Sequence, residues 1–158
     1  MHAAGALPAL APDHEADDVL GTLAHRAPGR VMIVTSDRDL YGVITETVQV
    51  YDPRTKSVVT ADDVERRFGV PPSRIPLFKC LAGDASDNIP GVHGLGEKGA
   101  ALMAARCSTV DEVFGQALSF HRRYQQALLA ADPEKIRLYH HLATVRLDAP
   151  VGRAAVRH

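Results

Sequence analysis

Residues 79–101, KCLAGDASDNIPGVHGLGEKGAA, hold two kinds of binding group in one stretch of sequence. Asp84 and Asp87 are three positions apart, a spacing that places both carboxylates on one face of a helical turn, within reach of one Mg²⁺ or Mn²⁺ ion. The glycine-rich turn at 91–96 lets backbone N–H groups approach a ligand closely, and the helix expected behind it adds its positive dipole end. We therefore predict a metal site followed by an anion site, with Lys98 at its rim.

The composition is that of one ordinary globular domain. The 158 residues are 46% hydrophobic and 23% charged, which excludes a disordered chain. The formal net charge is −1, so any binding of nucleic acid requires a local basic patch. Cys80 and Cys107 lack the spacing of a zinc site or a disulfide framework, which indicates buried free thiols in a cytoplasmic protein. Residues 1–13 have no basic flank and contain Pro8 and Pro12, so we expect neither a signal peptide nor a membrane span.

A second acidic group lies near the start of the chain. Apolar residues recur at helical spacing between residues 14 and 27 and stop at Pro28, which predicts a helix. Glu15, Asp17 and Asp18 occupy its first turn. Acidic residues favour a helix N-terminus because they complement its dipole, and on this motif alone that explanation is the stronger one. Glu15 and Asp18 are three positions apart and Asp17 is offset on the helix, so the three cannot all serve one ion in the same way.

A third acidic group follows a short apolar run, Val31 to Val34, which is long enough for a buried parallel strand. Asp37 and Asp39 come directly after it, where ligands bind in open α/β sheets. The alternative is an ordinary polar loop in which Asp39 caps a helix that begins at Leu40.

The rest of the chain alternates between turn residues and periodic apolar runs. Residues 47–51 and 57–59 are typical of strands, and Thr60 and Gly69 are typical of the two caps of a helix over 61–68. This makes Asp62 and Asp63 first-turn helix acids and not metal ligands. Further helices are predicted over residues 73–82, 97–106, 108 onward, 116–130 and 132–141. The basic residues between 121 and 141 are best explained as a solvated helical face.

Three segments resemble the 5′-nuclease superfamily, which includes the flap endonucleases and the 5′-3′ exonuclease domain of bacterial DNA polymerase I. The central stretch resembles the family segment GDxSDNIPGVxGxGxKTA, EADDVLGTLA resembles EADDxxGTLA, and TSDRDLYGV resembles TGDKDLLQL. The resemblance covers roughly residues 7–148, including a short strand and turn at 7–12, and corresponds to the later part of the family's catalytic domain.

The resemblance implies an α/β fold, with part of a parallel-sheet (PIN-like) nuclease core over residues 1–60 and a helical DNA-binding region over 61–148. A helix-three-turn-helix would span about 73–106, and we expect a flexible tail over 149–158. The metal ligands that it implies for Mg²⁺ or Mn²⁺, two ions in an intact site, are Glu15, Asp17, Asp18, Asp37, Asp39, Asp84 and Asp87. The DNA-binding residues would be Lys79, Gly91, His93, Gly94, Gly96 and Lys98, with K⁺ at the helix-three-turn-helix. Lys79 has two explanations, a phosphate contact or a solvated surface lysine.

The function implied is 5′-3′ exonuclease or flap endonuclease action in DNA replication or repair, by metal-assisted hydrolysis of phosphodiesters in a duplex with a 5′ end or flap. The family's first strand, a further acidic site and its arch would precede Met1, so we expect the chain to lack part of the domain and to need an N-terminal fragment. The alternative is a monomeric, inactive remnant that binds duplex DNA without sequence preference. A generic metal-binding or phosphatase-like α/β protein would explain the acids but not the glycine-rich turn.

Overall fold

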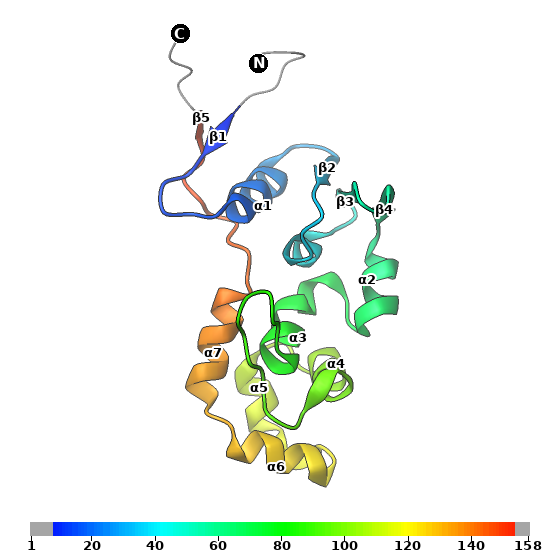
Figure 1. The fold of residues 1–158 in the computed structure, drawn as a ribbon, viewed down its shortest axis with the longest axis vertical. Helices are drawn as coiled ribbons and strands as arrows, with labels where there is room; N and C mark the ends of the chain where they lie inside the picture. Colours follow the sequence, from blue (N-terminus) through cyan, green and yellow to red (C-terminus); the bar gives the residue numbers. More distant parts are fainter. Residues whose placement is uncertain (1–7, 154–158) are drawn as a thin grey trace.

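A small mixed sheet forms in the first half of the chain in the computed structural model, which describes residues 8–153 (Figure 1). Strand β2 (Val31–Val34) pairs in parallel with β3 (Val48–Asp52), and β3 pairs antiparallel with β4 (Ser57–Val59). The register places Val34 of β2 beside Tyr51 of β3. The three strands predicted from the sequence are confirmed.

One edge of this sheet is open within residues 8–153, because β2 pairs only with β3 there. Ile33 is buried, but Met32 and Val34 on the opposite face are 46% and 64% exposed. The expectation of a buried parallel strand is therefore wrong for this face of β2. Parallel strands usually need cover on both faces, and the described residues cover one.

The inner side of the sheet is packed by the segments that follow each strand. Helix α1 (Ala16–Arg26) contacts β2, and the 3-10 helix η1 (Asp39–Val43) contacts β3 and α1. Leu40 and Tyr41 of η1 are buried in the same core as Val50 of β3. This packing fixes the end of β2 and the direction in which the chain leaves it.

The second half of the chain is helical. Its elements are α2 (Ala61–Phe68), η2 (Pro72–Arg74), α3 (Ile75–Ala82), α4 (Gly96–Arg106), α5 (Val110–Gly115), η3 (Ala117–Ser119), α6 (Arg122–Ala130) and α7 (Pro133–Leu142). Helix α2 has the predicted ends, since Thr60 and Asp63 form a capping box and Gly69 adopts the left-handed conformation. Helix α3 packs against both α4 and α7 and buries Leu77 and Leu81. It is thus the central helix of this half.

The helix predicted over 116–130 is interrupted. The backbone at Phe120 is extended, and its side chain is buried with the Arg106 guanidinium 5.1 Å from the ring centroid. The Gln125 amide donates hydrogen bonds to the carbonyl oxygens of Leu118 and Phe120, which have left the helical pattern. Burial of Phe120 therefore outweighs the local preference for a continuous helix.

The C-terminal segment, residues 144–153, returns from α7 to α1. The buried Thr22 hydroxyl donates to Arg146 O (3.3 Å) and accepts from Ala149 N (3.1 Å). Strand β5 (Gly152–Arg153) then pairs antiparallel with β1 (Ala9–Leu10). We expected a flexible tail from residue 149, but Ala149 is fully buried because these hydrogen bonds hold it on α1. Residues 154–158 of that tail and residue 7 of the expected first strand lie outside the described residues.

Two smaller expectations concern thiols and membranes. Cys80 and Cys107 are both free and buried, as predicted. Within the described part of the chain, no helix has the length and apolar character needed to cross a bilayer.

Candidate metal and phosphate site

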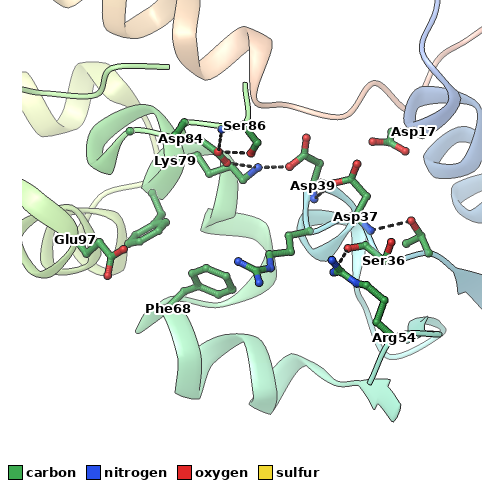
Figure 2. A pocket seen from close by; sticks show the side chains of 15 residues that line it. Asp17, Ser36, Asp37, Asp39, Arg54, Phe68, Lys79, Asp84, Ser86 and Glu97 are labelled. Atoms are coloured by element: carbon green, nitrogen blue, oxygen red, sulfur yellow. Dashed lines mark hydrogen bonds and ion pairs between the residues drawn. The ribbon is translucent and has the colours of Figure 1, made fainter. Parts of the chain in front are cut away.

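Carboxylates from three separate segments of the chain line one cavity of about 720 Å³ (Figure 2). Asp17 comes from α1, Asp37 and Asp39 come from the end of β2 and the start of η1, and Asp84 comes from the turn after α3. We call this space the acidic cavity. It lies where the sheet half meets the helical half, so neither half forms it alone.

The carboxylates fall into two groups that share one residue. In the first carboxylate group, Asp17, Asp37 and Asp39 each offer an oxygen within 4.8 Å of the others. In the second carboxylate group, Asp39, Asp84 and Asp87 do the same. Oxygen-only donor sets of this kind suit hard divalent cations such as Mg²⁺ and Mn²⁺. The two groups adjoin at Asp39, so the donor set fits two neighbouring ions.

The backbone after β2 turns through side-chain hydrogen bonds. The Asp37 N–H donates to Thr35 Oγ1 (3.0 Å), and the Asp39 N–H donates to the Asp37 carboxylate (3.1 Å). Asp39 is the first residue of η1, and the buried Leu40 behind it fixes its orientation. The alternative explanation made Asp39 the cap of the helix that begins at Leu40. In the structure the Asp37 carboxylate accepts the local backbone hydrogen bond instead. The Asp39 carboxylate points into the acidic cavity.

Asp84 and Asp87 lie in a tight loop and not on a helical turn. Asp84 and Ile89 exchange two backbone hydrogen bonds of 2.8 Å, which close the loop at its base. Behind it, Gly91 has φ +72°, and a Cβ there would lie 2.5 Å from Gly83 N. Only glycine fits such an approach, so Gly91 holds the acidic loop against the end of α3.

Lys79 lies among the carboxylates and not at the surface. Its side chain extends from α3, is 7% exposed as a residue, and pairs with Asp39, with Asp84 at 2.8 Å and with Asp87 at 3.4 Å. Figure 2 shows its ammonium between Asp39 and Asp84. The explanation of Lys79 as a solvated surface lysine is therefore wrong, because three carboxylates attract the ammonium inward, and its contact with phosphate stays a prediction.

Burial and neighbouring charge set the pKa values of these groups. Burial raises the pKa of Asp17 to about 6, and the Asp37 and Asp39 carboxylates add to the rise. Burial also raises the pKa of Asp39, against the lowering effect of Lys79. For Asp84, hydrogen bonds from Lys79 and Ser86 outweigh burial and lower the pKa. Burial opposes the charge of Lys79, but its carboxylate partners outweigh it and raise the pKa.

Two of the seven predicted ligands lie outside both carboxylate groups. Asp18 accepts a hydrogen bond from Arg146 N (2.8 Å) in the C-terminal segment. Glu15 is the exposed N-cap residue of α1. Successive helical residues point about 100° apart, so when Asp17 faces the acidic cavity Asp18 faces the C-terminal segment.

The glycine-rich turn lies next to the acidic cavity at the start of α4. Gly91, Gly94 and Gly96 all have positive φ, and His93 and Lys98 are exposed. No side chain caps the N-terminus of α4, so its first N–H groups are free of such a partner. This exposed helix start, with Lys98 beside it, lies where the anion site was predicted, and anion binding there stays a prediction.

Three charged residues that line the acidic cavity were not predicted as site residues, namely Arg38, Arg54 and Glu97. Arg38 stands between two predicted ligands in Asp37-Arg38-Asp39, which was a usable signal. Arg54 follows β3 and donates to Ser36 O (2.5 Å), so its position depends on strand pairing that no local motif records. Together the arginines place positive charge beside the carboxylates.

Both halves of the chain match models of known protein families. Residues 1–69 match a family model described as "5′-3′ exonuclease, N-terminal resolvase-like domain", and residues 70–156 match one described as "5′-3′ exonuclease, C-terminal SAM fold". The thermostable DNA polymerase I of Thermus filiformis is 40% identical over 144 residues, which are 89% of this chain and 17% of the polymerase. A 5′-3′ exonuclease of Buchnera aphidicola is 27% identical over 149 residues, 89% of this chain and 52% of the exonuclease.

Among solved structures, a bacteriophage T5 flap endonuclease described as a pseudo-enzyme–product complex with DNA and metal ions has a TM-score of 0.71. It is 23% identical, and the match covers 84% of this chain and 50% of that one. At this identity the likeness shows the fold, and it confirms the predicted α/β region followed by helices. The chain spans about half the length of this structure and of the curated exonuclease, and 17% of the polymerase.

The raised pKa of Asp17 predicts a pH dependence of stability in the metal-free protein. The folded state binds the Asp17 proton more tightly than the unfolded state, so stability falls as pH rises from 3.8 to about 6. Asp17→Asn should therefore raise the free energy of unfolding of the metal-free protein at about pH 7.5. The gain should be only about 1 kcal/mol, because solvent screens a partly exposed charge.

Urea unfolding across this pH range measures the effect, with Asp62→Asn on α2 as a charge-matched control. The Asp17→Asn gain should vanish at about pH 4, where the wild-type carboxyl is protonated. A gain that is the same at both pH values would contradict the raised pKa of Asp17.

Proposed function

The chain belongs to the 5′-3′ exonuclease family, and on that premise we propose that its acidic cavity binds divalent cations that hydrolyse DNA phosphodiesters. The observation that carries this proposal is the meeting of carboxylates from α1, η1 and the turn after α3 around Asp39. Carboxylates repel one another, so a fold that gathers them from three segments is best explained by a cation that they bind.

The residues of this chain would bind metal ions with one set of side chains and DNA with another. The first carboxylate group would hold one cation, and the second would hold another. Bound divalent ions would activate water and stabilise charge on the scissile phosphate. Arg38 and Arg54 would attract that phosphate into the acidic cavity, and the turn at Gly94 with Lys98 would hold the duplex by its backbone.

We propose Mg²⁺ or Mn²⁺ as the ions, two in number, and duplex DNA with a 5′ end or flap as the substrate. The similar flap endonuclease structure, described as a complex with DNA and metal ions, supports DNA and metal ions as ligands, and the oxygen-only donor set supports Mg²⁺ or Mn²⁺. Potassium at the turn preceding α4, action in replication or repair, and a cytoplasmic location belong to the same proposal. The domain division, with the metal core up to residue 60 and the DNA-binding region over 61–148, is also part of it.

A polypeptide strand is the partner that we propose for the open edge of β2. Met32 and Val34 are exposed on a parallel strand that has a neighbour on one side in the described structure, and such strands usually lie inside a sheet. The matched exonuclease and flap endonuclease contain about as much chain again as this one.

The alternative function remains a duplex-binding protein that does not cut.

Metal binding should depend most strongly on Asp39, because it belongs to both carboxylate groups. Asp39→Asn should weaken Mn²⁺ binding by about tenfold or more, since it removes a charged donor from both. Calorimetric titration measures this. Asp62→Asn, which removes an exposed acid on α2, should leave the affinity unchanged, and equal effects of the two variants would disprove the site.

Duplex binding should be independent of base sequence and strongly dependent on salt, because the anion site offers backbone N–H groups and few cations. Lys98→Ala should weaken binding to all duplexes alike and lower the slope of log K against log salt by about one. Fluorescence anisotropy with several duplexes tests this, with Lys135→Ala on α7 as the control lysine. A variant that altered preference between sequences would contradict a phosphate contact.

Cleavage separates the two candidate functions. We expect the purified chain to cut a 5′-flap substrate slowly at best in Mg²⁺, because an incomplete positioning unit costs orders of magnitude in rate. Addition of the polymerase segment that precedes the matched region in the Thermus relative should restore cutting, and Asp39→Asn should abolish it. Duplex binding without any cutting in the mixture would favour the non-cutting alternative, and fast cutting by the chain alone would disprove the need for a partner.

A further inference from the structure

Lys79 differs from every other lysine of the chain in its surroundings. Lys56, Lys98 and Lys135 are exposed, whereas Lys79 is 7% exposed on the central helix α3. Its neighbours Phe78 and Cys80 are also buried, so its stem runs through the core before the ammonium reaches the acidic cavity. A buried ammonium is stable where carboxylates replace its hydration.

The ammonium is held by the three residues of the second carboxylate group. Asp39 is its partner on η1, Asp84 lies at 2.8 Å, and Asp87 lies at 3.4 Å. These carboxylates also offer oxygens within 4.8 Å of one another, the arrangement that suits a metal ion. Lysine and a divalent cation would therefore use the same donors.

We propose that Lys79 is the built-in counter-ion of the second carboxylate group and that a divalent cation entering this group displaces its ammonium into the acidic cavity. This inference rests on the metal function proposed above. A divalent ion needs the carboxylate oxygens at 2.0–2.6 Å, closer than the ammonium holds Asp84 or Asp87. Two cations cannot share these oxygens without strong repulsion, so one leaves.

The displaced ammonium has a place to go. The acidic cavity has about 720 Å³ of space, and lysine carries its charge on a flexible four-carbon stem. In the cavity the freed charge joins Arg38 and Arg54, where a phosphate would lie. Metal loading would thus release a cation for DNA at the same moment as it forms the metal site.

The two carboxylate groups differ in how much of their charge Lys79 neutralises, since it pairs with all three members of the second group but only with the shared Asp39 of the first. Two divalent ions should therefore bind with unequal affinity. The weaker ion is the one that has to displace Lys79.

The first experiment is a Mn²⁺ titration of the full chain, followed by the electron paramagnetic resonance signal of free Mn²⁺. Lys79→Met keeps an unbranched stem and removes the charge, so it should tighten the weaker site roughly tenfold or more. Lys135→Met removes an exposed lysine and should titrate like the wild type. The double variant Lys79→Met with Asp84→Asn should lose the gain, which assigns it to the second carboxylate group.

The second experiment uses the wild-type protein and so does not depend on the folding of a variant. Lysine acetylation by an N-hydroxysuccinimide ester is followed at Lys79 by peptide mass spectrometry, with and without Ca²⁺. The rate at Lys79 should rise roughly tenfold with the ion, because the displaced ammonium becomes accessible, while the rate at Lys135 should not change. Ordinary stabilisation by a ligand would protect Lys79 instead.

The two experiments distinguish failure of the Lys79 displacement from failure of the proposed metal function. Mn²⁺ binding that Lys79→Met leaves unchanged or weakens, or acetylation of Lys79 that Ca²⁺ slows or leaves unchanged, would overturn the displacement and leave the metal function standing. Absence of Mn²⁺ binding in the wild type and in both lysine variants would overturn the proposed metal function together with this inference.

Discussion

Repulsion between carboxylates is the constraint around which the structure is arranged. Five aspartates belong to the two groups that meet at Asp39, and the only lysine among them is Lys79. Burial is the first cause of the raised pKa of Asp17, and repulsion by its acidic neighbours adds to it. The backbone has to hold these groups together at a cost, and functional sites commonly carry such a cost.

The elements that hold the carboxylates together come from the whole length of the chain. Helix α3 carries Lys79 and ends at the loop of Asp84, while its other face packs against α4 and α7. The C-terminal segment fastens α1 through Thr22, and α1 carries Asp17. Loss of either contact would therefore move a carboxylate, although neither contact touches the acidic cavity. The site depends on tertiary packing and not on any single motif.

The sequence predicted those parts whose cause is local. Thr60, Asp63 and Gly69 act on the backbone within a few residues, so the two ends of α2 were predicted correctly. The fold class and the family also followed from short motifs, and both are confirmed. The five aspartates that converge were all among the predicted ligands, and their roles remain proposals.

The parts that were missed have causes distant in sequence. Lys79 is drawn inward by Asp39, forty positions away, and Asp18 is turned towards Arg146 by the direction of α1. The break at Phe120 follows from its burial against Arg106. The open edge of β2 also escaped prediction, because a short apolar run does not reveal how many neighbours its strand has.

The most direct test of the account is a crystal structure of the full chain grown with Mn²⁺, with anomalous scattering recorded at the manganese absorption edge. We expect manganese peaks in contact with Asp39, one beside Asp17 and Asp37 and a second beside Asp84 and Asp87, with Lys79 turned away from the second. Manganese bound elsewhere on the protein, with Asp39 and Lys79 still paired at saturating Mn²⁺, would contradict it.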